Sequence, residues 1–249
     1  MRTSVHPPCR AGQRGVALLT ALLLMLAVLL SSIAAARTAI SGARAAGHER
    51  DRLLALQAAM AALADAEHDI EGGADPGSAR AAALAQATPA VFAPGCRGGR
   101  PYDGLCEHAP DARAVFALLA DDDGPAVALG TFTGALLPVG EGALPGQAPR
   151  YLIERMPSPT GALLYRVSAL GFGSTATTQV ALQAYYRKLP ALVPAPQPEP
   201  GPGQAQESGP QAPAPAPPAL PGTAGGPGIR VGWREIGNWH EVVAAGTEE

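Results

Sequence analysis

Apolar and polar positions divide the N-terminal part of the chain into three stretches. Residues 1–15 are largely polar and carry three arginines and no acid. Residues 16–36 form an apolar run without a charge, and about 20 apolar residues are enough for a helix to cross a bilayer. Residues 37–71 are rich in alanine, contain no proline and lead into Gly72-Gly73. This pattern predicts one helix over 16–71, about 80 Å long, that the two glycines end.

Within the second half of this expected helix, apolar side chains recur at intervals of three and four residues. Such spacing predicts one apolar stripe that packs on a folded domain. The stripe consists of Leu53, Leu56, Met60, Leu63 and Ile70. The charged residues that lie off it are Arg50, Asp51, Asp65, Glu67 and Asp69.

After residue 72 the pattern changes from helical to strand periodicity. We expect a short helix near 78–87 with Ser78 as its N-cap, a second over 111–120, and a turn at 121–124. Strands are expected over 150–155, 163–172 and 177–187, the last two joined as a half-buried antiparallel hairpin, and over 229–236. At least one of Trp233 and Trp239 should pack on the sheet. The predicted fold class is α+β, with a long N-terminal helix packed on a small antiparallel sheet.

Residues 190–228 differ from both neighbouring segments. They hold half of the chain's 26 prolines, among Gly, Ala and Gln. This composition cannot form a core and predicts an extended, flexible insertion before the last strand.

The three cysteines fall into two groups. Cys9 lies in the basic N-terminal stretch, whereas Cys96 and Cys106 flank a Gly-rich loop. In an outward-facing domain, Cys96 and Cys106 are expected to form a disulfide. Two free thiols are the alternative, and two cysteines alone do not complete a zinc site.

Charge and motifs exclude several classes of function. The net charge of −3 does not favour nucleic-acid binding. The sequence has no phosphate-binding Gly-Lys-Ser/Thr loop, no Gly-x-Ser-x-Gly elbow and no His-Glu-x-x-His pair. We therefore expect no enzyme activity, no catalytic residues, no metal and no cofactor.

Three interpretations of the apolar run remain open. A secretory signal peptide would be cut after Ala36 and would release an exported envelope binding protein. An uncut signal anchor would keep Met1, and a third type of leader would be cut between Gly15 and Val16. In each case the arginines hold the N-terminal side in the cytoplasm. The continuing helix after residue 36 favours the third.

The residues Arg14-Gly15-Val16-Ala17-Leu18-Leu19, together with 47–52, 56–59 and 64–67, resemble the PilX-type minor pilins of bacterial type IV pili. Residues 230–241 resemble the closing strand of that family, and Gly104-Leu105-Cys106 is also similar. The resemblance implies that prepilin peptidase removes residues 1–15 and methylates Val16. Most pilins carry glutamate at the fifth mature position, where this chain has Thr20. That departure fits a minor subunit near the tip, and it leaves the pseudopilin K of type II secretion as an alternative.

The resemblance implies a single-pass protein of the inner membrane with a cytoplasmic N-terminus and a periplasmic C-terminal domain, which also reaches the pilus tip. Expected partners are other minor pilins, the major pilin, prepilin peptidase and a tip adhesin. The expected role is pilus assembly, which supports adhesion or twitching motility indirectly. The expected organisation is a leader (1–15), a transmembrane half-helix (16–36), an amphipathic half-helix (37–71), a pilin domain (72–189), the insertion (190–228), and a closing strand with tail (229–249).

Overall fold

The structure is a computed structural model that describes residues 14–108, 112–175, 177–190 and 219–244. The chain divides into two compact units, a helical unit of residues 1–50 and a sheet unit of residues 51–249. The helix α1 (Arg14–Ile70) runs through the boundary between them. It ends where Gly72 and Gly73 adopt positive φ, and the Gly73 amide donates to the His68 carbonyl at 2.9 Å. The two glycines therefore end the helix, as the sequence predicts.

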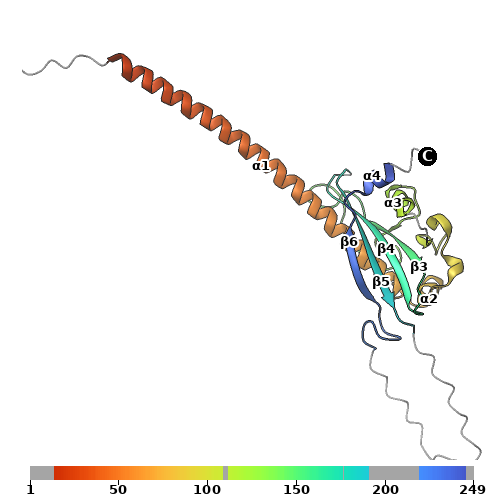
Figure 1. The fold of residues 1–249 in the computed structure, drawn as a ribbon. Helices are drawn as coiled ribbons and strands as arrows, with labels where there is room; N and C mark the ends of the chain where they lie inside the picture. Colours follow the sequence, from red (N-terminus) through yellow and green to blue (C-terminus); the bar gives the residue numbers. More distant parts are fainter. Residues whose placement is uncertain (1–13, 109–111, 176, 191–218, 245–249) are drawn as a thin grey trace, which may run out of the picture. The chain divides into compact units, whose positions relative to one another are not determined.

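The remaining elements all lie in the sheet unit (Figure 1). They are α2 (Ala79–Gln86), η1 (Pro89–Val91), η2 (Pro94–Cys96), β1 (Leu105–Glu107), α3 (Ala112–Ala120), β2 (Val127–Ala128), β3 (Arg150–Met156), β4 (Leu163–Phe172), β5 (Gln179–Lys188), β6 (Ile229–Glu235) and α4 (Trp239–Ala244). Ser78 caps α2 by accepting a bond from the Ala81 amide. The two short helices and four longer strands expected from the sequence are thus present.

One sheet joins the strands in the order β1-β3-β4-β5-β6, with β2 also paired to β3. The pairs β3–β4, β4–β5 and β5–β6 are antiparallel, but β1 pairs with β3 in parallel. The expected small antiparallel sheet is present over β3 to β6, and β1 adds a parallel pair at one edge that the sequence did not predict. With three residues in β1 and two in β2, these strands are too short to give a periodic hydrophobic signal.

Both faces of the sheet are covered. The C-terminal part of α1 packs on one face, against side chains such as Tyr151, Val167 and Leu182. On the other face α3, α4 and the two cysteines cover Leu152, Leu170 and Ala181, and Trp239 joins this cluster. The predicted half-buried hairpin is therefore buried on both faces, because α3 and α4 supply a second layer that the strand pattern did not reveal.

The face of α1 that meets the sheet consists mostly of alanine. Ala55, Ala59, Ala62, Leu63, Ala66 and Ile70 form it. Leu53 is exposed, and Leu56 and Met60 lie at the edge of the cluster. The predicted stripe is correct at Leu63 and Ile70 but is centred on the wrong side chains, because hydrophobicity-weighted spacing gives little weight to alanine.

Small side chains bring α1 and the sheet very close. A Cβ placed on Gly171 of β4 would lie 2.2 Å from the Ala55 carbonyl oxygen and 2.3 Å from the Ala59 nitrogen. Only glycine fits there. The seam between α1 and β4 is thus closed by backbone-to-backbone contact.

Candidate functional site

The apolar part of α1 is the first candidate functional segment. Within the described part of the chain, one helix is long and apolar enough to cross a membrane, and its residues from 16 to 50 are exposed. Its polar side chains bond within the helix: Thr20 donates to the Ala17 carbonyl at 3.0 Å, and Ser31 and Ser32 donate to the carbonyls four residues earlier at 2.8 Å. The hydroxyls of Thr20, Ser31 and Ser32 are therefore hydrogen-bonded within the helix, as an apolar environment requires.

The predicted leader lies almost wholly outside the described residues, which begin at position 14. Val16 and Thr20 lie in the first turns of α1. Cleavage after Gly15 and methylation of Val16 remain predictions.

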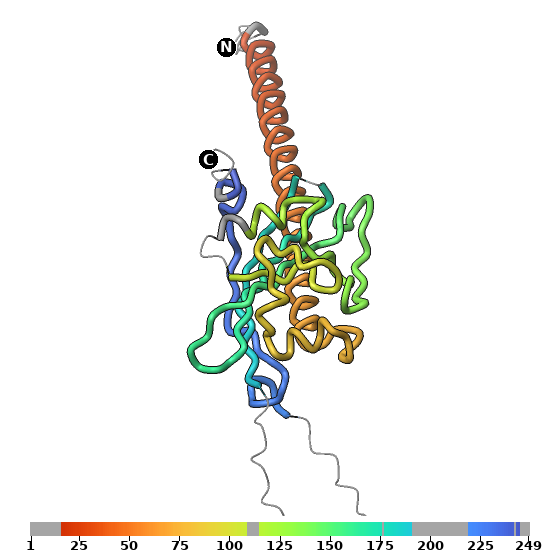
Figure 2. Tube along the Cα trace, turned by 90° about the vertical axis from the view of Figure 1, so that its right-hand side faces the viewer, coloured from red at the N-terminus to blue at the C-terminus, as the bar shows by residue number. Residues whose placement is uncertain are grey.

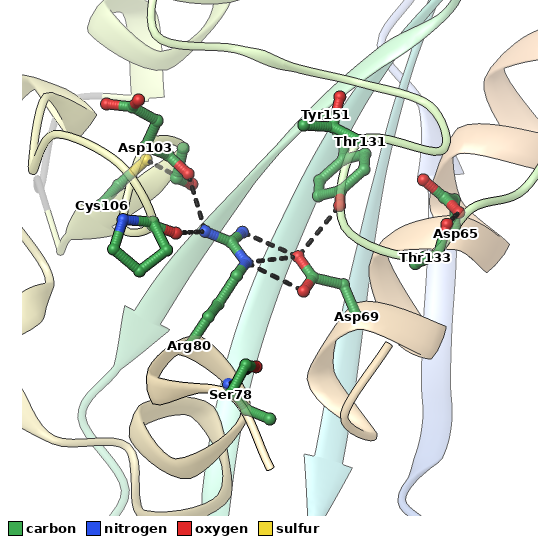
Figure 3. A network of polar contacts seen from close by, with 12 residues as sticks. Asp65, Asp69, Ser78, Arg80, Asp103, Cys106, Thr131, Thr133 and Tyr151 are labelled. Atoms are coloured by element: carbon green, nitrogen blue, oxygen red, sulfur yellow. Dashed lines mark hydrogen bonds and ion pairs between the residues drawn. The ribbon is translucent and has the colours of Figure 1, made fainter. Parts of the chain in front are cut away.

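In the sheet unit, a buried ion pair joins α1 to α2 (Figure 3). The Arg80 guanidinium donates to both Asp69 carboxylate oxygens at 2.7–3.0 Å, and both side chains are almost fully buried. The Tyr151 hydroxyl of β3 also donates to Asp69, at 2.9 Å. Burial and the nearby Asp69 charge raise the pKa of Tyr151, so its hydroxyl stays a neutral donor.

Arg80 uses its remaining donors on the loop between the two cysteines. Its Nη1 donates to the carbonyls of Pro101 and Asp103 at 2.7 and 2.9 Å. Its guanidinium also stacks 3.8 Å over the Phe132 ring. One side chain thus links α1, α2, the cysteine loop and the segment after β2.

Asp65, one turn earlier on α1, holds the loop that follows β2. Its carboxylate accepts from the Gly130 amide at 2.8 Å and from the Thr133 hydroxyl. The prediction that Asp65 and Asp69 lie off the packed face of α1 is wrong, since both are buried. The signal that was available is their spacing of four residues, which puts them on one helix face beside the buried Ala62 and Ala66.

Four further polar contacts run along the packed part of α1. Arg52 pairs with Glu235 at 2.6 Å and Glu67 with Arg230 at 2.6 Å, both on β6. Asp51 makes the third, and Glu71, which directly follows the last residue of α1, makes the fourth. We call these side chains and the two buried aspartates the α1 anchors; they are Asp51, Arg52, Asp65, Glu67, Asp69 and Glu71.

Asp51 and Glu71 have lowered pKa values. Partial burial alone would raise the pKa of Asp51, but hydrogen bonds from Ser174 and from Thr178 and Thr175 outweigh it and lower the pKa to about 2. At Glu71, burial opposes ionisation, yet bonds from Lys188 at 2.7 Å and from the Gly228 amide at 2.9 Å lower the pKa. Both carboxylates are therefore charged contacts that strengthen docking of α1.

Cys96 and Cys106 form a disulfide that joins η2 to β1. Beside it lies an open cavity of about 490 Å³. Its lining residues are Arg97, Gly99, Arg100, Asp103, Gly124, Pro125, Ala126, Val127, Ala128, Thr131 and Phe132. Among the described residues no group of three or more His, Cys, Asp or Glu side chains is placed to hold a metal.

The sheet unit matches a known family. Residues 102–188, which run from the cysteine loop through β5, match the family model described as type IV pilus assembly protein PilX, C-terminal. Residues 102–188 are thus similar to the C-terminal region of PilX-type type IV pilus assembly proteins. No curated protein and no solved structure matches it.

The PilX match covers the core of the sheet but neither end of the chain. It includes Gly104-Leu105-Cys106, which resembles the family in sequence, and stops before β6. The N-terminal segment and residues 230–241, where the resemblance was also expected, lie outside the match. The match also includes only part of the buried ion-pair site. Tyr151 lies inside the matched region, whereas Asp69 and Arg80 lie before it.

Proposed function

We propose that this chain is a PilX-type minor pilin that takes part in priming type IV pilus assembly and ends near the pilus tip. The family match over residues 102–188 carries the proposal, because it links the sheet unit to type IV pilus assembly. The exposed apolar helix in the same chain supports it, since a pilin needs such a helix for both membrane storage and filament packing.

In this proposal residues 1–15 are a leader that prepilin peptidase removes on the cytoplasmic side of the inner membrane. Residues 16–36 then hold the subunit in that membrane with its sheet unit in the periplasm. The arginines before the run favour this orientation. The disulfide fits the oxidising periplasm.

Helix packing supplies the energetic reason for assembly. Moving an apolar helix from lipid into a bundle of similar helices exchanges one apolar surround for another, and small side chains such as Ala17, Ala21 and Ala27 permit close approach. Other minor pilins and the major pilin are the proposed bundle partners. A tip adhesin is a further proposed partner, and adhesion or twitching motility would follow from assembly.

Thr20 fits a subunit at the end of a bundle. A carboxylate at that position costs a few kcal/mol in lipid unless it is paired. The Thr20 hydroxyl bonds to its own helix instead, so it needs no partner from a neighbouring subunit.

The deciding experiment is the N-terminal mass of the protein from cells with and without prepilin peptidase. The proposal expects methylated Val16 as the first residue, and an uncut chain when the peptidase is absent. A Gly15→Leu variant should stay uncut in both strains, whereas Gly42→Leu, a glycine substitution later in α1, should be cut normally. A mature chain that begins at Arg37 would contradict the proposal, as would an intact Met1 in both strains.

A further inference from the structure

The edge strand β6 has backbone groups that bond to no described residue. The Ile236 amide donates to the Ala181 carbonyl at 2.9 Å, and Arg234 pairs with Gln183 in the β5–β6 register. Hydrogen-bonded and non-hydrogen-bonded pairs alternate in an antiparallel ladder. The N–H and C=O groups of Trp233 and Glu235 therefore point away from β5, toward the open side of the sheet.

The side chains of β6 leave this edge accessible. Natural edge strands are protected by charges, bulges or covering segments. Here Glu235 and Arg230 are held against α1 by ion pairs, and the bulge lies opposite Tyr185 and Tyr186. Residues 232–235 thus form an edge without a bulge, and Arg234 is the one charge on it that no described ion pair holds.

The two faces of this edge differ in chemistry. Trp233 lies opposite Ala184, on the face that α1 covers, yet it is 50% exposed, and Val231 beside it is 62% exposed. On the other face Arg234 is exposed and bonds to the neutral Gln183 amide, with no described carboxylate within ion-pair distance. An exposed indole framed by charged side chains has the composition of a binding hot spot.

We propose that β6 binds an extended segment of a partner protein as an added strand, one with apolar residues toward Trp233 and an acidic residue toward Arg234. The outward backbone groups of Trp233 and Glu235 would supply the hydrogen bonds of this added strand. The proposal is independent of leader cleavage and of the position in the pilus.

A second copy of this chain does not satisfy the same edge. In a continuous antiparallel pairing of two β6 strands, residues of the same face lie opposite each other. Arg234 would then meet Gly232, Arg234 or Ile236 of the second copy, and none of these is acidic. A partner strand with an acid at this position is the occupant that the charge favours.

The test uses the full chain in detergent micelles and the peptide acetyl-Thr-Val-Glu-Val-Glu-Val-Thr-amide. Amide hydrogen exchange is followed at Trp233 and Glu235. At saturating peptide the exchange rate of both amides should fall to about one tenth of its value without peptide, or lower. The same peptide with lysine in place of glutamate is the matched control and should protect them far less.

Variants separate the backbone from the side-chain contribution. Trp233→Thr keeps the amide and should weaken binding about tenfold, and Arg234→Gln should weaken it about two- to fivefold. Trp233→Pro removes the outward amide without removing a bond to β5 and should abolish binding. Leu136→Ala, on a loop that Figure 2 shows in green on the side of the sheet unit away from β6, removes another exposed apolar side chain and should change nothing.

Three results would overturn the proposal. The first is unchanged exchange at Trp233 and Glu235 with millimolar acidic peptide. The second is equal protection by the lysine peptide. The third is protection that needs no peptide and rises with the concentration of the chain, which would make a second copy the occupant.

Discussion

At the scale of the residue, the Arg80 guanidinium connects α1, α2, the cysteine loop and the segment after β2. Its charge is balanced by Asp69 at 2.7 Å, both side chains are almost fully buried, and its other donors fix the cysteine loop. Removing one partner of such a pair leaves an uncompensated buried charge, which costs far more than loss of the pair as a whole.

We therefore expect Arg80→Met to lower the free energy of unfolding by about 3–5 kcal/mol. The double variant Arg80→Met/Asp69→Leu should recover much of that loss, because neither charge then remains buried. Urea unfolding of the full chain in detergent, followed by tryptophan fluorescence, measures both. Arg97→Met is the control: its side chain is 59% exposed and 3.5 Å from Asp121, so it should change stability by about 0.5 kcal/mol or less.

Asp51 gives the sheet unit a specific dependence on acid. Its pKa is lowered from 3.8 to about 2 in the folded chain. A lowered carboxylate pKa contributes stability that is fully present above pH 3.8 and is lost as the pH falls toward 2. Asp51→Asn should remove this contribution, so its stability should fall less steeply than that of the wild type between about pH 4 and pH 2.

The comparison is made by urea unfolding at a series of pH values and constant salt. Glu71, whose pKa is also lowered, leaves a residual slope in the Asp51→Asn variant. Parallel stability curves for the two proteins would show that Asp51 is not the carboxylate responsible.

At the scale of the element, the sequence predicted those features that depend on local periodicity. The end of α1 at its glycines, the Ser78 cap and the β4–β5 hairpin all follow from a few neighbouring residues. The parts it missed depend on contacts between distant segments. The strands β1 and β2 are short, and only pairing with β3 makes them strands.

The α1 anchors at the candidate site also depend on distant segments, so the sequence did not predict their contacts. Asp65 and Asp69 have the sequence character of solvent-facing helix residues, and nothing nearby reveals that Arg80 and Thr133 will meet them. The seam was missed for a related reason, because alanine supplies little hydrophobic signal but allows a close approach. Its tightness becomes evident only when Gly171 and Ala55 are seen together.

The closeness of α1 and β4 makes a clear prediction for Gly171→Ala. The added methyl group would lie 2.2 Å from a backbone oxygen, and backbone atoms cannot move aside as a flexible side chain can. We expect a loss of about 1–3 kcal/mol in the free energy of unfolding. Gly232→Ala on β6, where nothing lies within 4 Å of the added Cβ, should change it by about 0.5 kcal/mol or less. Equal effects of the two substitutions on urea unfolding would refute the tight seam.

At the scale of the whole molecule, both hydrophobic clusters and all six α1 anchors belong to residues 51–249. The helical unit contributes none of them. We therefore expect a chain that begins at Asp51 to fold with an unfolding temperature within a few degrees of the full chain.

A chain that begins at Gly72 is the matched control. It lacks the alanine face of α1 and would expose one face of the sheet, so it should not fold cooperatively. Circular dichroism and thermal unfolding distinguish the two truncations. A cooperative transition in the shorter chain would mean that α1 is dispensable for the sheet.

The α1 anchors also determine how the molecule carries mechanical load. They extend from Asp51 to Glu71, about 30 Å along the helix at 1.5 Å per residue. A pull along the helix axis acts on all of these bonds and on the alanine seam together, in shear, rather than opening them one after another as in peeling. The sheet unit therefore resists extraction of its helix most strongly along the axis of that helix.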